Sequence, residues 1–206
     1  MLLYAVTDRA FSKNNNLIFQ VEAALKGGAT CVQLREKNLD FESFLSEAKE
    51  ISALCKKFDV PFIINDNVEI ALKSNASGIH IGQKDMPASK VRQIVGKNMI
   101  MGVSVHNLKE AKKAEEDGAD YLGVGAMFKT STKDDAEIVS KNTLKAICSA
   151  TSLPVVAIGG INKENIKELS KTGACGVALV SAIFSAEDIE ARCKDLKKLS
   201  EETFLK

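Results

Sequence analysis

The chain has 206 residues, of which 45% are hydrophobic and 27% are charged, and its formal net charge is +1. A chain of this length can bury one substantial core, so we expect a single domain over residues 1–206. The balanced charge excludes a bulk field that would draw the protein to nucleic acid or to an anionic membrane. An anionic ligand would have to be held locally, by lysines, backbone N–H groups or a metal.

The five cysteines are scattered and form no CxxC pair. This spacing favours thiols in a reducing cytoplasm over a disulfide framework or a zinc site. The first apolar run meets Asp8 and Arg9 too early for a signal peptide or a membrane span, so it predicts a first strand. We therefore expect a cytoplasmic protein.

Short apolar runs alternate with longer amphipathic segments along the whole chain. Most of the short runs are apolar on both faces, which is typical of strands in a buried parallel sheet. The predicted strands are residues 2–7, 31–34, 62–65, 78–81, 99–103, 121–125, 155–159 and 176–180. The predicted helices are residues 41–58, 68–73, 88–95, 107–116, 141–150, 163–171 and 187–200.

This alternation predicts the α/β class and a single-domain (β/α)8 TIM barrel close to its minimum size. A doubly wound open sheet is the alternative architecture. No GxGxxG motif follows the first strand, which removes the usual dinucleotide site of that alternative. In a barrel, the loops that follow the strands form one face, and active sites lie on that face.

The residues that follow the second predicted strand are unusually polar. Gln33, Arg35 and Lys37 share a parity along the chain, so we expect their side chains to point the same way. A salt-bridged rim is the ordinary alternative for each of them. Because parallel like charges repel unless an anion lies between them, the three together favour an anion site.

Two carboxylates end neighbouring predicted strands. Asp66 follows Asn65 at the end of the third strand, and Asp85 lies in the loop after the fourth. Such a pair is the minimum set for a Mg²⁺ ion that keeps several waters and takes its other ligands from a diphosphate. Each acid could instead cap the helix that follows it, and the sequence leaves this alternative open.

The loop over residues 125–136, after the sixth predicted strand, gathers many hydrogen-bond donors at one strand end. It contains Thr130, Thr132 and Lys133 and has no apolar period. A solvated connection does not need this many donors. We predict that the loop contributes to the same phosphate-handling site.

The ends of the last two predicted strands lie where barrels commonly hold a phosphate. Gly160 lets backbone N–H groups approach an anion, and a short helix that begins near Ser181, directly after Val180, would add its positive end. The histidines His80 and His106 are more typical of hydrogen-bonded structural residues, and we expect neither to act as a catalyst.

The motifs at these positions resemble those of the thiamine-phosphate synthase (thiamine-phosphate pyrophosphorylase) family. They run in family order over nearly the whole chain, at residues 3–8, 33–37, 64–66, 80–87, 102–106, 130–136 and 157–161. The resemblance implies a Mg²⁺-dependent transferase with Mg²⁺ as its cofactor. An aminopyrimidine-methyl diphosphate would lose its diphosphate, and the nitrogen of a thiazole phosphate would take the freed methylene carbon. The products would be thiamine phosphate and diphosphate, formed in a dissociative step that needs no general base.

The resemblance also implies roles for individual residues. Asp66 and Asp85 would ligate Mg²⁺. The catalytic residues would be Lys133, Arg35, Lys37 and Ser104. The pyrimidine and its diphosphate would be bound by Gln33, Arg35, Lys37, Asn65, Ser104 and Lys133, and the thiazole phosphate by Thr130, Thr132, Gly160, Val180 and Ser181. Ala126 and Lys129 stand where family members often carry proline, and we expect these departures to tune affinity.

Three other functions remain as alternatives. A thiazole tautomerase of the same fold would need an acid or base where this chain has Ala126, and it would need no diphosphate site. A barrel aldolase would use Lys133 or another strand-end lysine as a Schiff-base nucleophile. A non-catalytic ligand-binding barrel would bind without releasing diphosphate, since fold alone does not decide function. The expected partners are small phosphorylated molecules, and a homo-oligomer is compatible with the sequence.

Overall fold

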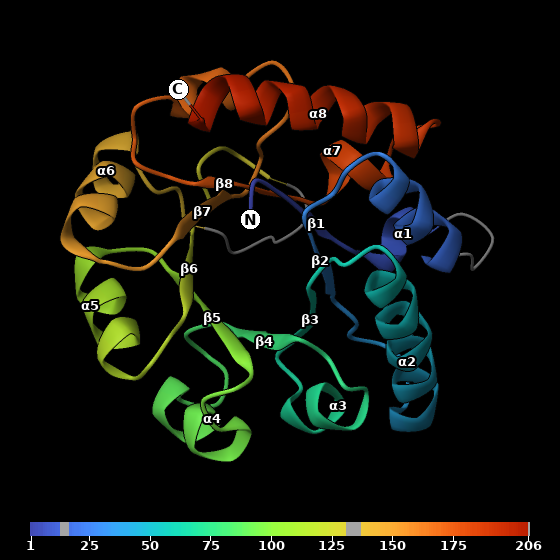
Figure 1. The fold of residues 1–206 in the computed structure, drawn as a ribbon. Coiled ribbons are helices and arrows are strands. Elements are labelled where there is room, and N and C mark those ends of the chain that lie inside the picture. The colour runs from blue at the N-terminus through green and yellow to red at the C-terminus, as the bar shows by residue number, and fades with distance from the viewer. Residues whose placement is uncertain (13–16, 131–136, 206) are drawn as a thin grey trace.

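The computed structural model describes residues 1–12, 17–130 and 137–205. Within this part of the chain, eight parallel strands close into a barrel in chain order (Figure 1). The first strand pairs with the second and also with the last, which completes the closure. The strands are β1 (Leu3–Val6), β2 (Cys31–Leu34), β3 (Phe62–Asn65), β4 (Gly78–Ile81), β5 (Ile100–Val105), β6 (Tyr121–Val124), β7 (Val155–Ile158) and β8 (Gly176–Leu179).

Helices surround the barrel, and α8 lies across the top of the view in Figure 1, where it packs against α1, α7 and η3. The α-helices are α1 (Leu17–Lys26), α2 (Phe41–Lys57), α3 (Val68–Lys73), α4 (Ala88–Val95), α5 (Leu108–Glu116), α6 (Lys141–Ala150), α7 (Ser181–Phe184) and α8 (Ile189–Phe204). The described residues also form the 3-10 helices η1 (Arg9–Phe11) and η3 (Ile166–Leu169). The prediction of a (β/α)8 barrel is confirmed.

Alternation along each strand divides the core into two layers. In β1, Leu3 and Ala5 face the helices and join the large outer core, whereas Tyr4 and Val6 face the inside of the barrel. The inner layer consists of Tyr4, Val6, Cys31, Ile63, Tyr121, Val156 and Ala178. Strands that are buried on both faces explain why the sequence shows continuous apolar runs.

The α-helix predicted over residues 163–171 is wrong, because the described structure has only the short 3-10 helix η3 there. The Asn162 Oδ1 atom accepts hydrogen bonds from the backbone N–H groups of Glu164 (2.9 Å) and Asn165 (3.2 Å). The Asn165 Oδ1 atom in turn accepts from the Asn162 N–H group at 2.9 Å. These local side-chain bonds compete with the α-helical pattern.

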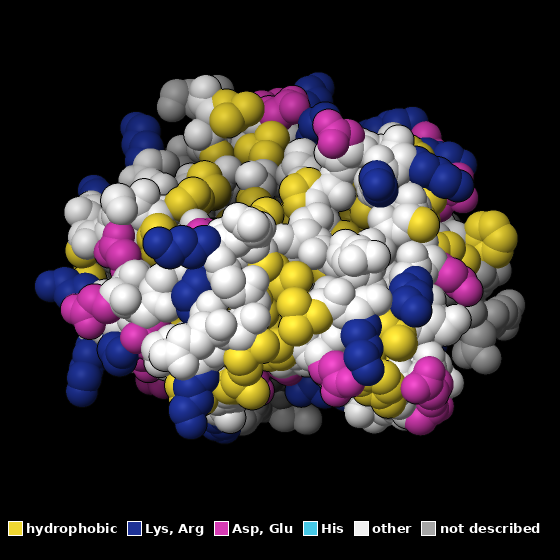
Figure 2. Space-filling view, turned by 60° about the horizontal axis from the view of Figure 1, so that its bottom comes forward, with side chains coloured by type: hydrophobic (Ala, Val, Ile, Leu, Met, Phe, Trp, Pro, Cys, Tyr) yellow, Lys and Arg dark blue, Asp and Glu magenta, His cyan; other side chains and the backbone are white. Residues whose placement is uncertain are grey.

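The surface carries both signs of charge. Figure 2 shows basic and acidic side chains interspersed over one face, with apolar side chains between them. The exposed large hydrophobic side chains include Leu72 on α3, Ile94 on α4 and Leu108 on α5, which belong to different helices. No helix among the described residues is long and apolar enough to cross a membrane.

We predict that Gly102→Ala destabilises the fold through one contact inside the barrel. A Cβ atom at Gly102 would lie 2.1 Å from Cζ of Tyr121, so the substitution should lower the free energy of unfolding by about 2 kcal/mol or more. Urea denaturation measures this loss. In a Tyr121→Ala background the same substitution should cost less than about 1 kcal/mol. An equal cost in both backgrounds would show that the ring does not set the penalty.

Candidate active site

Asp66 and Asp85 come together at the carboxyl ends of β3 and β4, with their carboxyls close enough to hydrogen-bond when one of them is protonated. Burial, the hydrogen bond with Asp85 and the charge of Asp85 raise the pKa of Asp66 to about 7. The positive charge of Lys37 and a hydrogen bond from Asn65 act in the opposite direction. Two carboxylates this close repel each other unless a proton or a cation lies with them, so the pair is suited to a divalent cation.

Asp66 is not the cap of the helix that follows it. The Asn67 side chain caps α3 by accepting from the Ile70 N–H group at 3.0 Å. Asp66 itself has a positive φ of 62°, and its backbone N–H group donates to the His80 carbonyl at 2.8 Å. A non-glycine residue in this left-handed region is uncommon and often belongs to a functional site.

Asp85 is not a helix cap either. The residue at the N-cap position of α4 is Pro87, which makes no side-chain capping bond. The Asp85 Oδ2 atom instead accepts from the Gly82 N–H group at 2.7 Å, which folds the loop after β4 back on itself. The capping alternative that the sequence left open is therefore wrong for both acids.

The expected shared direction of Gln33, Arg35 and Lys37 is only partly supported, because β2 ends at Leu34 and strand parity stops there. Gln33 is buried inside the barrel. Arg35 follows the strand, and its Nη1 atom donates to the Asp8 Oδ2 atom at 2.9 Å. Lys37 is exposed, and its charge acts on Asp66, so this cation does lie near the acid pair.

Glu36, to which the sequence analysis gave no role, shapes this basic loop. Its side chain is only 2% exposed and accepts from the backbone N–H groups of Lys37 (2.8 Å) and Asn38 (2.9 Å). Arg9 pairs with Glu36 and also with Glu47, at 2.6 Å. Burial acts to raise the pKa of Glu36, but the hydrogen bonds from Asn38 and Arg9 outweigh it and lower the pKa. The position of Glu36 between Arg35 and Lys37 in the sequence could have indicated this role.

A chain of buried hydrogen bonds links five inward-facing side chains. The Gln33 Nε2 atom donates to the Tyr4 hydroxyl at 2.7 Å, and the Tyr4 and Tyr121 hydroxyls lie 2.9 Å apart. The Tyr121 hydroxyl lies 2.8 Å from the His80 Nδ1 atom, and the His80 Nε2 atom lies 2.8 Å from the Ser104 Oγ atom. Burial lowers the pKa of His80 to about 4, so its ring is neutral near pH 7.

Both histidine rings are hydrogen-bonded within the protein. The His80 ring is engaged at both nitrogens inside the barrel. His106 lies 3.0 Å from the Glu110 carboxylate in the loop that leads into α5. The hydrogen bonds at both rings are as expected from the sequence, and the absence of a catalytic role for either histidine stays a prediction.

The loop after β6 packs closely on the loop after β7. A Cβ atom at Gly160, whose φ is +65°, would lie 2.6 Å from the carbonyl oxygen of Phe128 and 2.5 Å from that of Lys129. The Ala126 N–H group donates to the Glu137 carbonyl at 3.0 Å, a bond that proline could not make. Only glycine fits at position 160, where the backbone lies against the carbonyl groups of Phe128 and Lys129. Gly160 therefore lies beside the backbone that leads to Thr130.

Two residues predicted in the same loop, Thr132 and Lys133, lie outside the described residues. The neighbouring Val180 and Ser181 are described and occupy the turn from β8 into α7. The predicted short helix at Ser181 is therefore confirmed. Both residues follow a strand that pairs with β7, so they belong to the same rim as Gly160.

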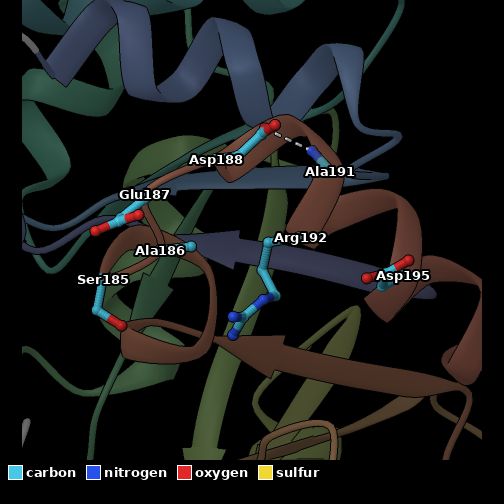
Figure 3. Close-up of a pocket in the computed structure, with 7 residues that line it drawn as sticks. All are labelled: Ser185, Ala186, Glu187, Asp188, Ala191, Arg192 and Asp195. Carbon is cyan, nitrogen blue, oxygen red and sulfur yellow. Dashed lines mark hydrogen bonds between the residues drawn. The ribbon is translucent and has the colours of Figure 1, made fainter.

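A separate hollow lies at the start of α8 (Figure 3). It is lined by Ser185, Ala186, Glu187, Asp188, Ala191, Arg192 and Asp195. Asp188 caps α8 by accepting from the Ala191 N–H group at 2.9 Å, and Arg192 donates to the Ala182 carbonyl of α7 at 3.3 Å. The Arg192 contact ties α8 to α7 and so supports the turn that carries Ser181, but the hollow contributes no group to the acid pair.

The described residues therefore define a class of protein: a (β/α)8 barrel whose paired acids and neighbouring cations, on the loops after its strands, suit phosphate chemistry. No group of three or more His, Cys, Asp or Glu side chains that could hold a metal occurs in the described part of the chain. Two carboxylates alone are typical of Mg²⁺ that shares a phosphorylated substrate, and not of a closed structural metal site.

Comparison with known proteins identifies the family. A family model described as thiamine monophosphate synthase matches residues 3–183. A thiamine-phosphate synthase from Clostridium tetani is 50% identical over 94% of this chain and 93% of its own, and one from Clostridium botulinum is 49% identical over 95% and 92%. A thiamine phosphate pyrophosphorylase from Pyrococcus furiosus has a TM-score of 0.91 at 39% identity, and the match covers 98% of this chain and 96% of that one. The chain belongs to the thiamine monophosphate synthase family, a family of transferases, as its motifs predicted.

We predict that Asp85→Asn lowers the pKa of Asp66 in the metal-free protein. The substitution removes a neighbouring negative charge but leaves the burial of Asp66 in place, so the pKa should fall and still stay above its ordinary value. A carboxyl-detected NMR titration measures the midpoint. Glu190→Gln, which removes an exposed carboxylate on α8, is the control and should leave the midpoint unchanged. An unchanged midpoint in Asp85→Asn would mean that the two acids do not interact.

Proposed function

We propose that the chain is a Mg²⁺-dependent thiamine-phosphate synthase. It would join an aminopyrimidine-methyl diphosphate to a thiazole phosphate and release diphosphate. The observation that carries the proposal is the contact of Asp66 with Asp85 beside the charge of Lys37. Family membership supports the reaction, and the raised pKa of Asp66 supports the cation. Paired carboxyls that bind a proton near pH 7 concentrate negative charge, and a metal cation can neutralise that charge in place of the proton.

In this proposal, Asp66 and Asp85 would hold Mg²⁺, whose charge would stabilise the oxygens of the departing diphosphate. Arg35 and Lys37 bind the same diphosphate and stabilise the negative charge that develops as the carbon–oxygen bond breaks. Glu36, which is held by Arg9, keeps the basic loop in place. A preorganised loop is important because the charges then need no rearrangement during the reaction.

The remaining residues position the two organic substrates. Gln33, Asn65 and Ser104 line the side of the pyrimidine. Thr130, Gly160, Val180 and Ser181 bind the thiazole phosphate, and Thr132 and Lys133 keep the roles that the family resemblance gives them. No general base is assigned, because the attacking thiazole nitrogen carries no proton. This mechanism requires neither His80 nor His106 as a base.

The thiazole tautomerase alternative is less well supported. It would need an acid or base at position 126, where a buried alanine stands, and it would give the Asp66–Asp85 pair no role. We further propose that the protein acts in the cytoplasm on these small molecules, without nucleic acid or membrane, and that a homo-oligomer is compatible with this activity. The net charge of +1 and five free cysteines support this setting.

The reaction is tested by mixing both phosphorylated precursors with the protein and Mg²⁺. Thiamine phosphate and inorganic diphosphate should form in equal amounts, and chelation of the metal should stop both. Isomerisation of a thiazole without diphosphate release would support the tautomerase. Binding of both precursors without turnover would support the ligand-binding barrel. A borohydride-trapped adduct would support the Schiff-base alternative.

We predict that Asp85→Ala lowers the Mg²⁺-dependent rate by about 100-fold or more while the protein stays folded. Outer-shell partners of metal ligands alone can account for 10–100-fold, and Asp85 is proposed as a direct ligand on an exposed loop. The rate of diphosphate release is measured together with circular dichroism. Glu187→Ala removes a carboxylate from the hollow in Figure 3 and should keep the wild-type rate. A near-normal rate for Asp85→Ala in Mg²⁺ would end the metal assignment.

We predict that Gly160→Ala raises KM for the thiazole phosphate much more than KM for the pyrimidine diphosphate. A Cβ atom there would push apart the loops after β6 and β7, because it would meet two carbonyl oxygens at 2.5 and 2.6 Å. Gly96→Ala is the matched control: its φ is +70°, but nothing lies within 4 Å of the added atom. Both variants carry backbone strain, so equal kinetic effects would remove the specific role of Gly160.

A further inference from the structure

The hydrogen-bond chain from Gln33 to Ser104 has a preferred direction. The Gln33 amide nitrogen can only donate, so Tyr4 accepts from it and must place its own proton elsewhere. If Tyr4 donates to Tyr121, then Tyr121 donates to His80 Nδ1, and the His80 Nε2–H group donates to Ser104. In this direction every proton in the chain meets a strong acceptor.

The reverse direction is less favourable. Tyr4 would then accept from both Gln33 and Tyr121, and its own proton would be left with the nearby thiol of Cys31. Sulfur is a weak acceptor, and a buried hydroxyl proton without a good acceptor is costly. The first direction therefore fixes His80 as the tautomer that carries its proton on Nε2.

The strands leave space for both rings of this chain. Gly102 stands beside His80 in the register of β4 and β5, and beside Tyr121 in that of β5 and β6. A Cβ atom at Gly102 would lie 2.1 Å from the Tyr121 ring. At Gly123, which pairs with Ser104, a Cβ atom would lie 3.2 Å from Cε1 of His80. Packing on two strands thus holds the rings where the hydrogen bonds need them.

We infer that His80 is a positioning residue that turns the Ser104 hydroxyl into a hydrogen-bond donor toward the pyrimidine diphosphate. Because Ser104 Oγ accepts from His80 Nε2, its own proton is available to the substrate side. Ser104 is partly exposed, and its carbonyl accepts from Gln83 Nε2 at 2.7 Å, which joins it to the loop that carries Asp85. This inference rests on the proposed function for the identity of the ligand.

The direction of the hydrogen-bond chain also determines which kind of ligand atom the Ser104 hydroxyl can bind. A hydroxyl that donates fits a ring nitrogen with a lone pair or a diphosphate oxygen, and it does not fit an amino group that is itself a donor. Ser104 would therefore recognise an acceptor on the diphosphate substrate. The thiazole phosphate, which is assigned to the loops after β6, β7 and β8, would not depend on it.

The tautomer can be read without substrate by ¹⁵N NMR of the histidine rings. The chain has two histidines, so His106→Gln assigns the remaining signals to His80. We expect a protonated Nε2 and an unprotonated Nδ1. Tyr121→Phe removes the donor to Nδ1 and should yield a mixture of tautomers. Tyr4→Phe keeps that donor and should retain the Nε2 tautomer. A ring protonated on Nδ1 in the wild-type protein would overturn the direction.

Kinetics then test whether His80 acts through Ser104. Ser104→Ala and His80→Leu should each lower kcat/KM for the pyrimidine diphosphate about tenfold, the net worth of one hydrogen bond, and change KM for the thiazole phosphate by less than about twofold. In the Ser104→Ala background, His80→Leu should cost no more than about twofold. His80→Gln, which can still donate, should restore part of the loss. Additive losses in the double variant would assign His80 a purely structural role and overturn the inference.

These two experiments separate the inference from the proposed function. If the wild-type protein releases no diphosphate, the proposed function fails, and the tautomer measurement still decides the direction of the chain. If the wild-type protein is active but the losses are additive, only the role of His80 fails. If His80→Leu does not fold, the Tyr121→Phe and Tyr4→Phe pair decides by NMR and by kcat/KM.

Discussion

Closure of the parallel sheet is the constraint on which the rest of the molecule depends. The pairing of β1 with β8 removes the two sheet edges that would otherwise leave unpaired backbone groups. Because all strands of the closed barrel run the same way, their carboxyl ends form one rim. The contact between Asp66 and Asp85, and the influence of Lys37 on Asp66, follow from this geometry. The chemistry of the site is thus a consequence of topology as much as of residue type.

The inside of the barrel adds a second constraint, since it is narrow and contains two tyrosines. Tyr4 and Tyr121 are each 1% exposed, so both hydroxyls require partners within the protein. The bonds that satisfy them continue through His80 to Ser104, which we propose binds the diphosphate substrate. The same hydrogen bonds therefore satisfy the buried polar groups and orient the hydroxyl that we propose binds substrate. A change in the packing inside the barrel would therefore alter the orientation of the Ser104 hydroxyl.

The sequence predicted the barrel well, because strands buried on both faces leave continuous apolar runs, and it placed both Asp66 and Asp85 on the correct loops. It could not exclude helix capping by these acids, since Asn67 and the turn at Gly82 decide that only in three dimensions. It extended strand parity too far beyond β2, and it missed Glu36, whose partner Arg9 is distant along the chain. The helix predicted over residues 163–171 failed because local asparagine bonds outweighed an apolar period.

We propose that Asp66 and Asp85 share one divalent cation with a diphosphate bound by Arg35 and Lys37. Crystals of the protein with Mn²⁺ and inorganic diphosphate test it most directly, because anomalous scattering locates the manganese. We expect one ion in contact with a carboxylate oxygen of each acid and with an oxygen of the diphosphate. Diphosphate bound elsewhere, or manganese that touches neither acid, would contradict it.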